Sequence, residues 1–452
     1  MRVPLPLQSY QPQSSARLVN FCIEQAPEEG KSPLQLVRLP GITTFATATG
    51  FGRGCYTFQD QLYAVSGTSL YRIASNGSVT RLGSVGGSGR CFFADNGNEL
   101  TISSDNVLYR WDGSSVSTPS TGRLVGMLTA LDSYILANEP GSGRFFSSAL
   151  KDASTWSGLF FATAEGAPDN LVGIICDHRE LFLAGKNSYE LWYDQGDPTG
   201  GFPFARSPSG FGEQGCLSGA SLGKIDNTVF WLADDFTARR LTQGTPVKVS
   251  QYGVEGALRG YDNSNAYSLT FAWNGHLFYA LVIPNQGTWV YDCSTEKWHE
   301  RQTYGAADWQ VSGTASAYNR VMMQDRTTGA IGYLDPTTIA EFGRPRRDVI
   351  QSGQIYSNGN LIKHYALELR IRKTAKQTGA TANPLIRLEM ANNGSDAWIS
   401  TQPKPLGMIG DKPRVRWTRL GSARERVYRL VVTDPVPLAI EDMQLDLSVG
   451  LS

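Results

Sequence analysis

Charged residues are scarce in this sequence, and neither sign dominates. Only 18% of the 452 residues are charged, and 41 Lys and Arg balance 41 Asp and Glu, so the formal net charge is zero. Globular domains usually contain roughly 25% charged residues. The balance argues against a general basic coat for nucleic acid, although local basic patches stay possible.

Cysteine and histidine are also too few and too scattered to form a metal site. The six cysteines form no C-x-x-C pair, and the four histidines form no H-x-H or H-E-x-x-H pattern. In a long chain, widely spaced cysteines are typical of small buried hydrophobes in a reducing compartment. We therefore expect no metal and no cofactor.

Long apolar runs and helical periodicity are missing as well. No stretch approaches the roughly 18 apolar residues of a membrane-spanning helix, so we expect none. Residues 1–15 contain one Arg and three prolines but no apolar core, so they do not read as a secretory signal. Without apolar residues at a 3.6-residue period, an array of helical repeats is disfavoured.

Short strands bounded by Asn, Asp and Gly recur along the chain instead. Each unit is a hairpin, and its first inward apolar residue returns every 34–48 residues. These residues are Leu62, Leu100, Tyr134, Leu181, Val229, Leu277 and Val321. The spacing is that of propeller blades, which run about 40–50 residues. Seven hairpins, together with an N-terminal segment able to complete a blade, predict an all-β propeller of six or seven blades over residues 35–345.

The pattern changes after about residue 344. A polar connector leads into clean two-residue alternation, in which Tyr365, Leu367, Leu369 and Ile371 share one strand face. The same alternation returns in residues 386–390 and 443–449. It predicts a C-terminal antiparallel β-sandwich over residues 350–452. Residues 1–34 are then left as an N-terminal extended segment.

No catalytic set emerges from the sequence. His178 follows Asp177, but such a polar cluster before an apolar strand is more typical of a turn than of a general base. The runs Gly87–Arg90 and Gly141–Arg144 lead into strands, whereas a phosphate loop opens a helix, so we interpret them as tight turns. The tryptophans near strand ends read as blade core. We predict that the chain is not an enzyme and assign no catalytic residue.

A basic run near the C-terminus is the clearest local signal. Residues 412–429 contain seven Lys and Arg, opposed only by Glu425. We expect a hairpin here, with residues 420–423 as the turn and 427–432 as the returning strand. Its arginines would form a solvated face, a salt-bridge seam with a neighbouring subunit, or contacts with phosphates from a channel. With the connector arginines, the candidate interface or lumen residues are Arg344, Arg346, Arg347, Arg414, Arg416, Arg419 and Arg426.

Several stretches resemble one protein family. The segment from Lys412 to Leu447 is similar to the C-terminal signature of the packaged DNA stabilisation proteins, the tail hubs of short-tailed (podovirus-type) bacteriophages. "LVRLPGIT" at residues 36–43, "GSGR" at 87–90 and "AEGAPDNLVGI" at 164–174 resemble further motifs of that family, in the same order.

The resemblance implies a structural virion protein, made in the host cytoplasm and placed in the tail. Such hubs (nozzles) form hexameric rings below the portal and its adaptor, carry tailspikes or tail fibres, and hold the tail needle. They retain the packaged double-stranded DNA and form part of the ejection channel. Two alternatives stay open on sequence grounds: a carbohydrate-binding or carbohydrate-active propeller, and a protein-binding scaffold propeller.

Overall fold

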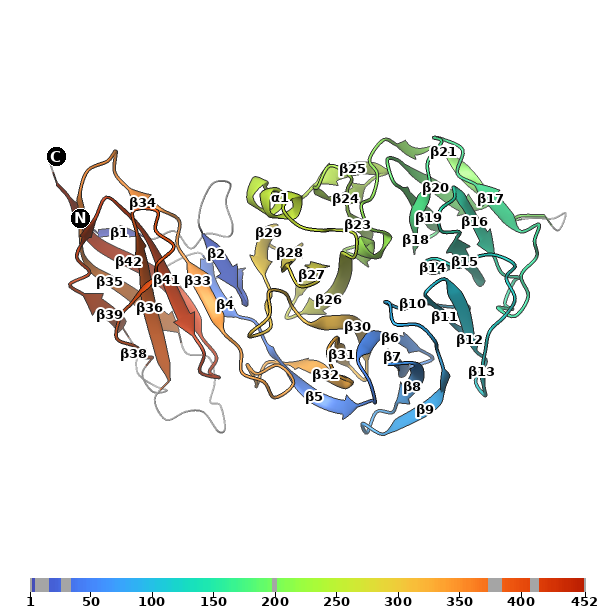
Figure 1. Ribbon diagram of the computed structural model, residues 1–452, viewed down its shortest axis with the longest axis horizontal. Coiled ribbons are helices and arrows are strands. Elements are labelled where there is room, and N and C mark those ends of the chain that lie inside the picture. The colour runs from blue at the N-terminus through green and yellow to red at the C-terminus, as the bar shows by residue number, and fades with distance from the viewer. Residues whose placement is uncertain are drawn as a thin grey trace.

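The computed structural model places a ring of small sheets beside a β-sandwich (Figure 1). It describes residues 2–4, 16–25, 34–196, 201–372, 384–406 and 414–450. Strands dominate, and within these ranges the one α-helix is α1 (Tyr252–Arg259), which lies between two sheets of the ring. No helix of the described chain is long and apolar enough to cross a membrane. The all-β prediction is confirmed.

The ring is a propeller of seven four-stranded blades. Blade 1 contains β6 (Gly52–Phe58), β7 (Gln61–Ser66), β8 (Ser69–Ile73) and β9 (Val79–Ser84). Blade 2 contains β10 (Phe92–Asp95), β11 (Leu100–Ser104), β12 (Val107–Trp111) and β13 (Val116–Ser117). Blade 3 contains β14 (Leu128–Leu131), β15 (Tyr134–Asn138), β16 (Arg144–Ser147) and β17 (Phe161–Thr163). Blade 4 contains β18 (Leu171–Asp177), β19 (Glu180–Gly185), β20 (Tyr189–Asp194) and β21 (Phe204–Gly212). The short 3₁₀ turn η1 (Gly219–Ser221) leads into blade 5, which contains β22 (Gly223–Ile225), β23 (Thr228–Leu232), β24 (Ala238–Thr242) and β25 (Thr245–Lys248). Blade 6 contains β26 (Tyr267–Trp273), β27 (His276–Ile283), β28 (Gly287–Asp292) and β29 (Lys297–Glu300).

Blade 7 closes the ring with a strand from the other end of the propeller sequence. It contains β30 (Val311–Ala317), β31 (Arg320–Asp325), β32 (Ala330–Asp335) and β5 (Gly41–Thr47). β5 pairs antiparallel with β32, with Ile42 opposite Leu334. The N-terminal segment therefore completes a blade, and the number of blades is the higher of the two predicted.

The first strand of each blade lies next to the axis, where space is short. Gly313 on β30 approaches blade 1 so closely that a Cβ atom there would lie 2.7 Å from the Cys55 backbone nitrogen. At Gly173 on β18, a Cβ atom would lie 2.8 Å from the Cα of Gly219. Glycine at these two positions lets the inner strands converge.

Aromatic side chains fill the space between blades. Trp231 on β23 packs against Phe182 of blade 4 with ring centroids 5.1 Å apart, and both rings are buried. Trp298 is likewise fully buried, and Trp192 and Trp289 are buried in blades 4 and 6. The prediction of blade core is confirmed for these four tryptophans, whereas the fifth, Trp273, is half-buried and packs against the edge of the core.

The sandwich consists of two facing sheets. The first contains β3 (Phe21–Gln25), β4 (Leu34–Arg38), β42 (Ala439–Val449), β35 (Ile362–Arg372) and β39 (Arg414–Thr418), with β1 (Arg2–Pro4) on β42 and β40 (Ser422–Ala423) on β35. The second contains β2 (Arg17–Val19), β33 (Asp348–Gln351), β41 (Glu425–Val432), β36 (Leu385–Asn392) and β37 (Ile399–Ser400), with β34 (Ile355–Tyr356) on β41 and β38 (Lys404–Pro405) on β36. The sandwich prediction is confirmed.

The alternation that predicted the sandwich fails at Tyr365 and, at the end of β42, at Val449, which is 45% exposed. Leu367, Leu369 and Ile371 of β35 are buried in the sandwich core, but Tyr365 is 53% exposed. The register between β35 and β42 shifts between His364 and Ala366, so the bulge turns the Tyr365 side chain outward. Its hydroxyl lies 2.8 Å from Ser448 Oγ.

The N-terminal residues contribute directly to this sandwich. β1, β2 and β3 lie within the segment 1–34. β1 pairs with β42, β2 with β33 and β3 with β4, so all three belong to the sandwich sheets. Phe21, Ile23 and Leu36 belong to the same apolar core as the C-terminal strands. The sandwich is therefore built from both ends of the chain.

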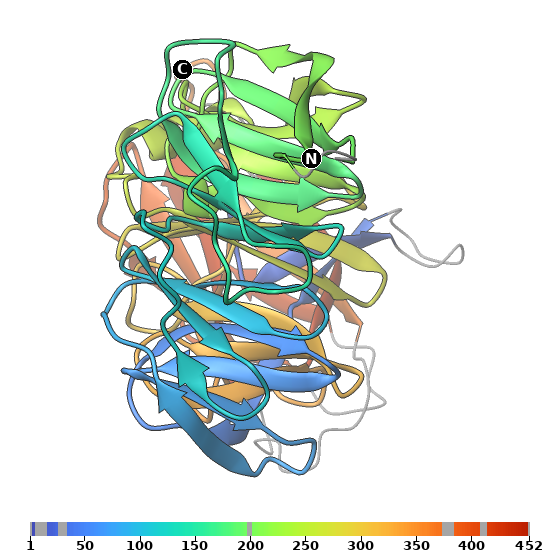
Figure 2. The same cartoon turned by 90° about the vertical axis from the view of Figure 1, so that its right-hand side faces the viewer.

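One sheet runs without a break from the propeller into the sandwich. The outer strand of blade 6, β29, pairs parallel with β2, with Val19 opposite Glu300. β2 pairs antiparallel with β33, and β33 with β41. Viewed from the propeller end (Figure 2), the sandwich lies behind the blades. Backbone hydrogen bonding thus joins the two parts of the molecule.

Candidate functional site

Two of the seven candidate arginines are enclosed by this chain itself. Arg346 is 2% exposed, and its guanidinium donates to both carboxylate oxygens of Asp348 at 2.7 and 2.9 Å. Arg426 is also 2% exposed and donates to the side-chain oxygen of Asn392 at 2.7 Å and to the Leu420 carbonyl at 2.6 Å. Both guanidinium groups are therefore buried and hydrogen-bonded within the chain.

Arg414 and Arg416 lie on the outer face of the first sandwich sheet, as the alternation predicted. In β39 they are exposed while Val415 between them is buried. Arg414 forms an ion pair with Glu368 of β35, and Arg416 lies 3.1 Å from Asp446 of β42. The carboxylates expected on a neighbouring subunit are thus found on β35, which is next to β39, and on β42, one strand further along the same sheet.

The predicted hairpin is wrong. β39 pairs with β35 in the first sheet, whereas β41 pairs with β36 and β33 in the second. The intervening residues cross from one sheet to the other, so the two basic stretches face opposite sides of the sandwich. Lys412 lies outside the described residues.

The remaining three candidates differ in exposure and in pairing. Arg419 is exposed at the crossover with a φ of +60°, and its backbone N–H donates to the Tyr365 carbonyl at 2.9 Å. Arg344 lies at the end of the propeller, 2.6 Å from Asp325. Arg347 is half-buried at the outer side of the junction, where burial and then the charge of Arg429 lower its pKa. In the described chain, Arg419 has no ion-pair partner.

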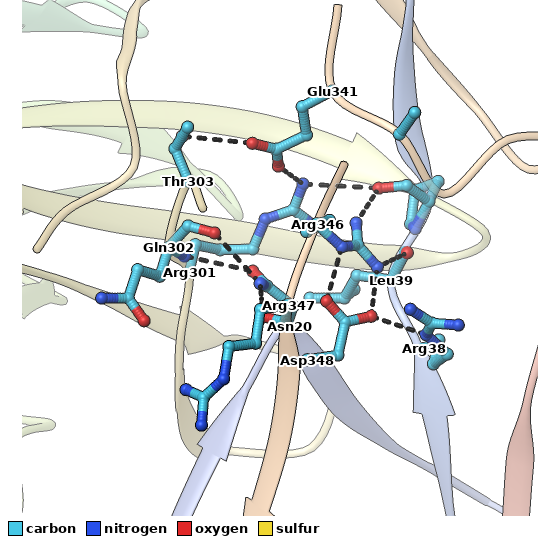
Figure 3. A network of polar contacts seen from close by, with 12 residues as sticks. Asn20, Arg38, Leu39, Arg301, Gln302, Thr303, Glu341, Arg346, Arg347 and Asp348 are labelled. Atoms are coloured by element: carbon cyan, nitrogen blue, oxygen red, sulfur yellow. Dashed lines mark hydrogen bonds and ion pairs between the residues drawn. The ribbon is translucent and has the colours of Figure 1, made fainter. Parts of the chain in front are cut away.

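Buried charges hold the propeller against the sandwich (Figure 3). Arg38, at the end of β4, donates to Asp348 at 2.6 Å and to the Val436 carbonyl at 2.6 Å. Arg346 donates to the carbonyls of Leu39 and Pro40 at 2.7 and 2.9 Å. Burial alone would raise the pKa of Asp348, but the guanidinium groups of Arg346 and Arg38 hold it below its ordinary value.

A second set of buried contacts extends this junction into blades 6 and 7. Glu341 accepts from Thr303 and from the Trp309 indole, both at 3.1 Å, and lies 3.7 Å from Arg301. Burial lowers the pKa of Arg301 to about 10. Asn20, between β2 and β3, donates to the Gln302 carbonyl at 3.0 Å. The chain therefore ties three separate segments together at one place.

His276 forms a further bridge across the junction. Its Nδ1 lies 2.7 Å from Asp292 in blade 6, and its Nε2 lies 3.0 Å from Glu24 on β3 of the sandwich. The hydrogen bond to Asp292 is the largest cause that raises the pKa of His276, which reaches about 9 despite partial burial. His276 is thus protonated and positively charged at neutral pH, and it pairs with both carboxylates.

The remaining candidate chemistry resolves into turns. His178 lies in the turn between β18 and β19 with a φ of +54°, 66% exposed and 3.1 Å from Asp177. Gly87 and Gly141 adopt φ values of +84° and +77° just before β10 and β16, as tight turns require. No group of three metal-ligating side chains occurs in the described part of the chain.

The centre of the propeller is hollow. A cavity of about 790 Å³ opens on one face of the ring, and Arg53, Arg90, Asp105 and Arg326 are among the residues that line it. A sugar site would need tryptophans beside paired acids, yet among the described lining residues no tryptophan and one acid occur. The carbohydrate alternative thus gains no support from the cavity.

Of the junction residues, the sequence singled out Arg346 and Arg347. It did not single out Arg38 or Asp348, although it held an indirect signal for each. Arg38 lies within the "LVRLPGIT" motif and Asp348 follows the connector arginines. Their partners come from segments about 300 residues apart, as with Arg38 and Asp348. A linear reading shows the residue types but cannot pair them. His276 and Glu24 carried no local signal.

Comparison with known proteins places the chain in a family. A family model described as "Bacteriophage P22 Gp10, beta-propeller" matches residues 14–339, which include all seven blades. None of the curated proteins matches the chain. One similar solved structure, the extracellular domain of a protein described as the hybrid two component system BT4673 of B. thetaiotaomicron, is 10% identical with a TM-score of 0.43. That alignment covers 77% of this chain and 45% of the other, so this chain spans less than half of that protein. On the family match, which extends over well more than half of its length, the chain belongs to the phage packaged-DNA stabilisation family and is a phage structural protein.

Proposed function

We propose that this protein is the tail hub (nozzle) of a short-tailed phage virion. In this proposal it forms a homohexameric ring below the portal and its adaptor, retains the packaged genome, and forms part of the channel for DNA ejection. Its partners are the portal-bound adaptor, a tailspike or tail fibre, the tail needle, and the double-stranded DNA that passes through. It is made in the host cytoplasm and resides in the virion tail.

The observation that carries this proposal is the continuous sheet from blade 6 into the sandwich, in a chain of the packaged-DNA stabilisation family. A hub that holds a pressurised genome needs modules that do not swing against each other. Hydrogen-bonded strands and the buried Arg38–Asp348–Arg346 contacts supply such a joint. A flexible linker would transmit far less force.

The particle itself gives the most direct test. Phage particles produced without this protein should package DNA but lose it, and added wild-type protein should restore retention and a six-fold ring in electron micrographs. The mass measured in solution should be that of a hexamer, either for the protein alone or after the adaptor is added. Particles that keep their DNA and infectivity without the protein would contradict the hub assignment.

An interface role falls best on Arg419, because Arg414 and Arg416 already pair within the chain. Arg419→Asn keeps a residue that tolerates positive φ and removes the charge. We expect Arg419→Asn to weaken assembly with little change in the melting temperature of the monomer. Arg179→Asn, on an exposed propeller turn, is the control and should assemble like the wild type. If assembly is intact but DNA retention fails, Arg419 contacts DNA instead.

A further inference from the structure

The two cavities along the propeller axis meet at a charged side chain. The larger, about 790 Å³, is lined by residues of six blades and of η1, and the smaller, about 330 Å³, continues along the axis. Arg90, Phe92, Met127 and Ala220 line both. Arg90 therefore lies deep in the ring and still keeps part of its surface accessible.

Positive charge predominates around the larger cavity. Among the described residues, its lining includes Arg53, Arg90, Lys186 and Arg326 but only one acid, Asp105. Asp105 is used locally, since it accepts the backbone N–H of Ser88 at 2.8 Å. These basic groups line a recess in the protein, where water screens charges less than on an open surface.

Arg90 is held in position without a counter-ion. Its guanidinium donates to the Ser312 carbonyl at 2.6 Å and lies over the Tyr267 ring at 4.1 Å from the centroid. In the part of the chain that the structure describes, no carboxylate lies within 4.0 Å of it, whereas Arg326 has Asp308 at 2.6 Å. Enclosed charges in proteins are normally paired, because an unpaired one is costly.

A second guanidinium adds to the imbalance. Arg326 donates to the Tyr267 hydroxyl at 3.3 Å, so Arg90 and Arg326 approach the same ring. Burial, and to a smaller extent the like charge of Arg326, lowers the pKa of Arg90. Both groups face the same cavity, and because Asp308 pairs with Arg326, the charge of Arg90 is the one left unbalanced in the described chain.

We propose that the central cavity binds a small tetrahedral oxyanion, phosphate or sulfate, on the guanidinium of Arg90. A guanidinium presents a planar fork of donors that matches two oxygens of such an anion. Lys186 at the cavity wall adds long-range attraction. The bound anion would join blade 2, which carries Arg90, to blades 6 and 7, which carry Tyr267 and Arg326.

Calorimetric titration of the full-length chain with sodium phosphate tests the proposal, with chloride holding the ionic strength constant. We expect one saturable site per chain. Arg90→Gln should weaken binding by about tenfold or more, equivalent to loss of one charge-assisted contact. Lys186→Gln, at an exposed side chain, should weaken it by about two- to fivefold. Arg72→Gln, an exposed arginine on β8 away from the cavity, should bind like wild type.

Two results would overturn the proposal. One is the absence of a saturable phosphate site in the wild-type chain, and the other is equal affinity of the Arg90→Gln and Arg72→Gln variants. If Arg90→Gln does not fold, Arg90→Lys and Lys186→Gln decide the matter. Wild-type affinity in either variant would then count against the proposal, and reduced affinity in both Lys186→Gln and Arg90→Lys would support it.

Discussion

Replacing Asp348 with the isosteric amide tests the junction most sharply, because both halves of the molecule share this carboxylate. It accepts from Arg38 at 2.6 Å and from Arg346 at 2.7 and 2.9 Å, and the three side chains are inaccessible to solvent. Asp348→Asn would leave two enclosed guanidinium groups without their anion. Removing one partner of a buried pair costs about 3–5 kcal/mol of unfolding free energy. Backbone carbonyls still accept from both arginines, so we expect the lower end of that range.

Urea unfolding of the purified chain, followed by tryptophan fluorescence and circular dichroism, measures this loss as a lower midpoint. Asp226→Asn is the matched control, since Asp226 lies 3.6 Å from Arg240 with both side chains partly exposed. Surface pairs of this kind contribute about 0–1 kcal/mol. Adding Arg346→Gln to Asp348→Asn should recover part of the loss. A loss for Asp348→Asn no larger than that of the control would refute the reasoning.

Three further predictions concern pH, the propeller axis and α1. The pKa of His276 is raised to about 9 from an ordinary 6.5, so its contribution to stability is complete below pH 6.5 and is lost as the pH rises through 9. His276→Gln should therefore flatten the decline of the melting temperature at alkaline pH. An unchanged slope would count against the bridge to Glu24 and Asp292. Gly313→Ala should destabilise the chain by about 1–3 kcal/mol, because its Cβ would meet the Cys55 backbone at 2.7 Å; a neutral effect in thermal unfolding would disprove the crowding. Gly256→Ala in α1 should instead stabilise by about 0.5–1 kcal/mol, because that Cβ meets no atom within 4 Å; the same melt tests it, and a lower melting temperature would be inconsistent with open space there.

The propeller was predictable because each blade is local in sequence. Strands that pair within a blade are joined by short turns, and those turns need residues that accept positive φ. Asp105 and Asn106 join β11 to β12 with φ values of +46° and +67°, and Asp226 and Asn227 join β22 to β23 in the same way. Such pairs are visible in the sequence, and their regular return indicated the blades.

Pairings between distant segments could not be predicted in the same way. No local feature of residues 17–25 indicates that β2 joins blade 6 to the sandwich or that β3 supplies Glu24 to His276. The basic run failed for a related reason. The acids that neutralise Arg414 and Arg416 lie on β35 and β42, so counting charges along residues 412–429 overestimated the free positive charge.

The sheet that connects blade 6 to the sandwich also limits where strands of other molecules can pair with the propeller. An outer blade strand presents unpaired backbone groups to any approaching strand, and in blade 6 the sandwich strand β2 already occupies that edge. In blades 2 and 3 the outer strands β13 and β17 contain only two and three residues, which leaves little edge for pairing. In blade 7 the backbone of residues 338–342 already bonds to the start of the outer strand β5, at Gly41 and Ile42. The outer strands β9, β21 and β25 lie on blades 1, 4 and 5. Within the described chain, ring neighbours that pair edge to edge would therefore meet the propeller at blades 1, 4 or 5 and leave the connection at blade 6 intact.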